Sequence, residues 1–165
     1  MDPFLAVEIT SRSDHTRELL VRLADDARLK APRLAASVMF VLQALDGLLK
    51  LTGATTEPDP EGRDHETRTC DVSELEGLPI TLVQRWLADT QSVAHSLCQL
   101  VELADGRTSE SEFVLVRTAV GRVLGYLYTE IEAPLWAAFP DLVPKEMQDG
   151  RTPEANERGD VGAVK

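Results

Sequence analysis

The stretch that decides the fold is LAASVMFVLQALDGLLKL, residues 34–51, the most apolar part of the chain. At 100° per residue, its large aliphatic side chains fall on one half of a helical cylinder, whereas Gln43, Asp46 and Lys50 fall on the other half. This pattern predicts an amphipathic helix over residues 32–51. It disfavours a membrane span, because an Asp near the middle of a bilayer costs about 2.5–3.5 kcal/mol.

The same helix is more apolar than one buried stripe requires. Met39 and Phe40 project from its polar half, beside the small Ala44. Because fully burying a Phe side chain is worth about 1.5–3 kcal/mol, we predict a homodimer contact or a partner groove centred on these three residues. One alternative stays open: the N-terminal segment FLAVEI, residues 4–9, could fold back over this face within the same chain.

Three further segments place their apolar residues at helical spacing. The periodicity predicts helices over residues 14–30, 79–104 and 109–133, in addition to the one over 32–51. Apart from the ambiguous FLAVEI, no stretch of a strand's length alternates apolar and polar residues. We therefore predict an all-α protein with the architecture of a four-helix bundle.

Local signals set the expected ends of two of these helices. Ser11 and Asp14 have the spacing of a capping box, which predicts that the first helix starts near Asp14. Ser109 and Glu112 have the same spacing at the start of the last helix, and Pro134 is expected to break that helix at its end.

The domain organisation follows from the polar segments between and after the helices. Residues 1–149 are predicted to form a single helical domain that contains a long acidic loop over 52–78. Gly and Pro residues interrupt this loop, although Ser73–Glu76 is expected to add one helical turn. Residues 150–165 are predicted to be a disordered tail.

The net charge of -11 excludes some partners. An acidic surface repels phosphate backbones, so we expect no nucleic-acid binding, and we expect no membrane association either. It suits a basic protein partner, although solubility alone also explains it. Two cysteines, and an N-terminus without a basic segment or a small-residue cleavage site, predict a cytoplasmic protein. The excess of Arg over Lys indicates a GC-rich bacterial genome.

No constellation of residues predicts chemistry. His15, His65 and His95 are scattered, and no second Glu/His pair exists for a di-iron site, so we predict no metal and no cofactor. Cys98 lies three residues after His95, but a thiol in a helix interior lacks the cationic neighbour or helix N-terminus that activates a cysteine nucleophile. It is expected to act as a small apolar residue bordering the helix core. We predict no catalytic residues and no enzyme activity.

A strip of small residues marks the last predicted helix. Thr118, Gly121, Gly125 and Thr129 lie beside its apolar face, and such a strip lets another backbone approach closely. Either a helix of the same bundle approaches Gly121 and Gly125, or they form a second candidate seam for a partner.

Two functions compete at this stage. The favoured one is a non-enzymatic soluble bundle that acts through protein–protein interaction, as an adaptor, a secretion chaperone or an immunity-type binder, with another protein or with itself as a homodimer. The alternative is a bundle that binds a small molecule or a metal and has weak hydrolase-type activity. A buried polar cluster or inward-facing histidines would favour the alternative, and an exposed apolar groove would favour the first.

Overall fold

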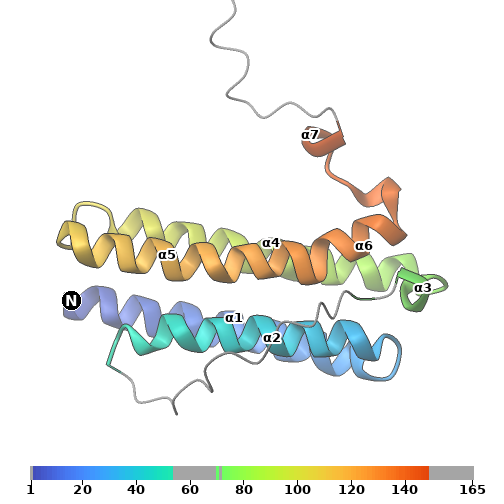
Figure 1. Ribbon diagram of the computed structural model, residues 1–165, viewed down its shortest axis with the longest axis horizontal. Helices are drawn as coiled ribbons and strands as arrows, with labels where there is room; N and C mark the ends of the chain where they lie inside the picture. Colours follow the sequence, from blue (N-terminus) through green and yellow to red (C-terminus); the bar gives the residue numbers. More distant parts are fainter. Residues whose placement is uncertain (1, 54–69, 71, 149–165) are drawn as a thin grey trace, which may run out of the picture.

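The computed structural model describes residues 2–53, 70 and 72–148. These residues form helices and no strand, and the four long helices pack together, which confirms the predicted all-α four-helix bundle (Figure 1). The long helices are α1 (Pro3–Arg28), α2 (Pro32–Lys50), α4 (Ile80–Ala104) and α5 (Glu110–Tyr126). The shorter elements are α3 (Val72–Leu75), the π-helical segment η1 (Leu127–Glu132), α6 (Ala133–Ala138), η2 (Pro140–Leu142) and α7 (Lys145–Gln148).

The helices follow one another around the bundle in the order α1, α2, α5, α4. α1 packs against α2 and α4, and α5 packs against the same two helices. Each helix is antiparallel to both of its neighbours, and α2 and α4 lie diagonally opposite each other (Figure 1). α2 ends where α1 begins, whereas α3 and the start of α4 lie at the opposite end of the bundle (Figure 1).

This topology explains why a long connection precedes α4. The end of α2 and the start of α4 lie at opposite ends of the bundle, so they are separated by about the length of α2, about 28 Å at 1.5 Å per residue. Most of the predicted acidic loop, and all of the predicted tail over 150–165, lie outside the described residues. Within the loop, α3 supplies the helical turn that was predicted over Ser73–Glu76.

The first helix is longer than predicted. It starts at Pro3, and the side chain of Asp2 caps it by accepting a hydrogen bond of 2.9 Å from the Phe4 N–H. Leu5 and Ile9 are fully buried and continue the apolar face of the helix. The predicted start near Asp14 was therefore wrong, and FLAVEI forms the first turns of α1 instead of a separate cover over α2.

The predicted break at Pro134 was also wrong. The helix continues from α5 through η1 into α6, with Pro134 near the start of α6. Proline has no N–H to donate to the preceding turn, so an uninterrupted α-helix would leave a carbonyl without its partner. In η1 the Ala133 N–H bonds to the Tyr128 carbonyl, five residues back, and this wider turn carries the chain past the proline.

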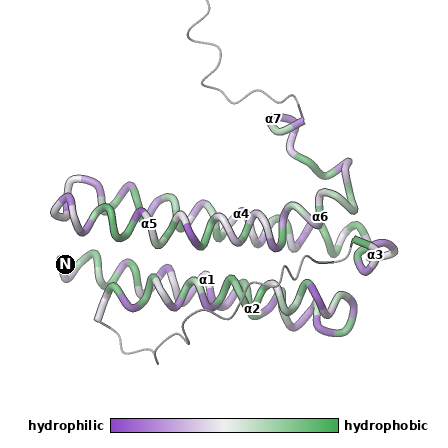
Figure 2. Tube along the Cα trace, viewed as in Figure 1, coloured by the Kyte–Doolittle hydropathy of each residue, from purple (hydrophilic) through white to green (hydrophobic). Residues whose placement is uncertain are grey.

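The core lies along the bundle axis. Apolar and polar residues alternate along the long helices with the period of an amphipathic helix (Figure 2). Among the described residues, α2 is the one helix long and apolar enough, by length and composition alone, to cross a membrane, and half of it is buried in the bundle. Trp86 is the largest of the fully buried side chains.

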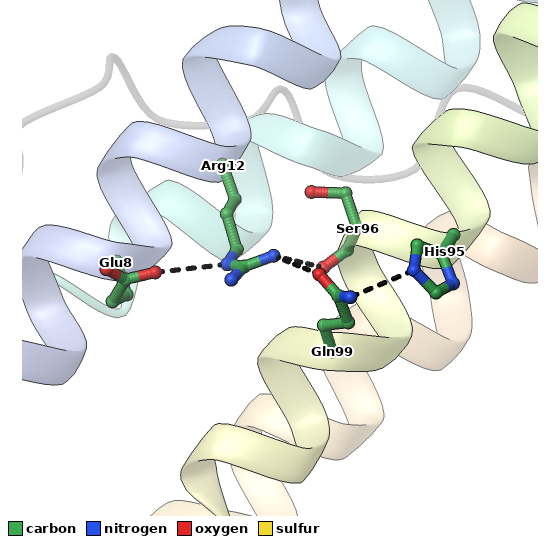
Figure 3. Close-up of polar contacts among 5 residues, drawn as sticks. All are labelled: Glu8, Arg12, His95, Ser96 and Gln99. Carbon is green, nitrogen blue, oxygen red and sulfur yellow. Dashed lines mark hydrogen bonds and ion pairs between the residues drawn. The ribbon is translucent and has the colours of Figure 1, made fainter.

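Charged side chains connect α1 to both of its neighbours. The Arg12 guanidinium on α1 donates to the Glu8 carboxylate at 3.1 Å and to Gln99 Oε1 on α4 at 2.8 Å (Figure 3). Arg22 pairs with Asp89 of α4 at 2.7 Å, which raises the pKa of Arg22, chiefly through this hydrogen bond. Further ion pairs join Arg85 to Asp26 and Arg17 to Asp46. The α1 edges of the bundle are therefore polar and internally paired.

Candidate protein-interaction surface

The edge between α2 and α5 centres on an aromatic contact, whereas the α1 edges carry ion pairs. The ring centroids of Phe40 and Tyr126 are 4.6 Å apart in an edge-to-face arrangement. Because the two helices are antiparallel, one turn further along each of them brings Ala44 opposite Arg122. The aromatic pair is thus followed by a shallower stretch with a small residue on α2.

Four residues on the outer sides of these two helices form what we call the α2–α5 face. They are partly or fully exposed to solvent and are apolar or small: Phe40, Ala44 and Gly47 on α2, and Leu115 on α5. Leu115 is the most prominent of them, with 56% of its surface exposed. On α2, the small Ala44 and Gly47 leave helix backbone accessible from outside. Gly121 and Gly125 are also exposed, but at 100° per residue they lie about 140° and 100° around α5 from Tyr126, on the side of the helix that faces solvent.

The three glycines inside the long helices have no structural explanation within the described chain. Gly47, Gly121 and Gly125 are exposed, and a Cβ atom added to any of them would meet nothing within 4 Å. None has the positive φ that favours glycine. No helix among the described residues approaches Gly121 or Gly125, so the interpretation that a helix of the same bundle packs against this strip is not supported.

The structure separates Met39 from Phe40 and Ala44, with which the sequence grouped it. Met39 is 53% exposed and lies two helical turns from Asp46, so both are on the side of α2 that faces α1, where Asp46 pairs with Arg17. Phe40 lies on the other side and is partly covered by Tyr126. The predicted contact centre thus falls on two edges of α2.

The exposed part of α5 is locally basic, although the chain is acidic. Between Phe113 and Thr129, the charged residues are Arg117 and Arg122, and both are exposed. Neither guanidinium has an ion pair or hydrogen bond within the described part of the chain. Charge on the protein surface is screened over about 8 Å at physiological ionic strength, so the local sign matters more for a docking partner than the net charge.

The histidines do not converge. His15 and His95 are exposed, and His65 lies outside the described residues. His95 Nε2 accepts a hydrogen bond from the Gln99 side-chain amide at 2.9 Å (Figure 3). Where the structure describes the chain, no group of three or more His, Cys, Asp or Glu side chains could hold a metal ion.

Dialysed protein is accordingly expected to carry no stoichiometric zinc, iron or manganese. Elemental analysis of the purified chain measures this directly. About one metal ion per chain, lost in His15→Ala or His95→Ala, would contradict the prediction, because a bound ion depends on its ligands.

The two cysteines differ in their environments. Cys98 is exposed on α4, so the expectation that it borders the buried apolar face was wrong. Cys70, just before α3, is buried.

A buried polar pair was missed by sequence reasoning. Thr90 is fully buried on α4, and its hydroxyl donates to Glu132 Oε1 in η1 at 2.8 Å. Burial raises the pKa of Glu132, and the hydrogen bond from Thr90 opposes that shift. The sequence carries no signal for this pair, because the residues are far apart in the chain and the π-helical turn that aims Glu132 was not predicted.

Replacing Glu132 with Gln is expected to stabilise the protein above pH 5. Because folding raises the pKa of Glu132 above its unfolded value near 4.5, protonated Glu132 stabilises the fold at low pH. This stabilisation is lost as the pH rises through the higher folded pKa. Gln stays neutral and still accepts from Thr90, so the melting temperature at pH 7.5 should rise by about 1–3 °C, a small change because Glu132 is only half-buried.

Circular dichroism melts from pH 4 to pH 8 measure this effect, with the exposed Glu18→Gln on α1 as the control. A lower melting temperature for Glu132→Gln at pH 7.5 would show that the charged form stabilises the fold.

No family model, curated protein or solved structure matches the chain. The fold defines its class as an all-α helical bundle, and the α2–α5 face is its candidate functional surface.

Proposed function

We propose that this chain is a non-enzymatic bundle that acts in the cytoplasm through protein–protein interaction, as an adaptor, chaperone or immunity-type binder. Its partner is another protein or a second copy of the chain. One observation carries the proposal: the three glycines inside the long helices, Gly47, Gly121 and Gly125, all lie exposed with open space above them.

The energetic argument is direct. Each glycine in a helix interior costs about 0.8–1.0 kcal/mol relative to alanine, and alanine would fit at all three positions without a contact. The described fold gains nothing from them, whereas a partner gains close access to the helix backbone. On the α2–α5 face, Leu115 and the Phe40–Tyr126 pair supply apolar surface near Gly47.

The competing function, binding of a small molecule or metal, has less support. Its expected mark is inward-facing histidines, and the two described histidines are exposed. The Thr90–Glu132 pair is a buried polar contact, but Thr90 and Glu132 already bond to each other.

A comparative capture experiment tests the proposal. The immobilised wild-type chain and its Leu115→Asp variant are incubated with soluble extract of the source cell, and bound proteins are quantified by mass spectrometry. Val21→Asp is the matched control, because Val21 is an exposed apolar residue on α1, away from the α2–α5 face. Light scattering of the same proteins at tens of micromolar measures self-association.

The expected result is at least one protein, or the chain itself, enriched about tenfold or more on the wild type and on Val21→Asp relative to Leu115→Asp, a ratio that corresponds to about 1.4 kcal/mol. If no protein distinguishes the variants and the wild type is a monomer, the proposed function fails.

A further inference from the structure

We draw no further inference here: the strongest candidate, the apolar α2–α5 face around Phe40, Ala44, Gly47 and Leu115, belongs to the surface already described, and nothing in the described part of the chain shows which molecule covers it.

Discussion

Replacing Trp86 with alanine is expected to lower the free energy of unfolding by about 3–5 kcal/mol, the range for deleting a large aromatic side chain from a core. Trp86 is fully buried on α4 and is the largest of the fully buried side chains. Natural domains have free energies of unfolding of about 5–15 kcal/mol, so this one change removes at least about a fifth of the stability. Urea unfolding followed by circular dichroism measures the loss.

Trp86→Phe is the matched variant. The indole Nε1 is buried and has no hydrogen-bond partner in the described chain, so phenylalanine keeps most of the ring volume and removes an unpaired polar group. Its loss should stay below about 1.5 kcal/mol. Equal losses for the two variants would show that the indole N–H, and not the ring, holds this part of the core together.

Replacing Gly121 and Gly125 together with alanine is expected to raise the free energy of unfolding by about 1.6–2 kcal/mol, twice the helix preference of alanine over glycine. Nothing lies within 4 Å of either added Cβ, so no clash offsets the gain. For a chain of this size the melting temperature should rise by about 3–8 °C. Thermal melts of the wild type and the double variant measure it.

Gly106→Ala provides the opposite control. Gly106 has a φ of 73°, a conformation that alanine adopts only with strain, so this variant should melt at a lower temperature than the wild type. If the Gly121/Gly125 variant were also destabilised, the two glycines would be needed by the fold itself. The argument that exposed helix glycines mark a binding surface would then be lost.

The candidate site was partly predictable from sequence. The small strip on α5 and the apolar excess on α2 both stand out in the residues, and the structure places Phe40, Ala44, Gly121 and Gly125 on adjoining helices. The sequence could not show that the glycines are open to solvent, or that Tyr126 partly covers Phe40. Those facts depend on which helix lies next to which.

The sequence by itself determined the class of fold and the extent of α2 and α4, because helical periodicity is a local property with a period of 3.6 residues. It also located the start of α5, where the predicted capping box of Ser109 and Glu112 is present. Only the tertiary structure decided the order of the helices around the bundle, the contact of Phe40 with Tyr126 and the continuation of the helix past Pro134. These features depend on contacts between residues far apart in the chain, where core packing outweighs local preference.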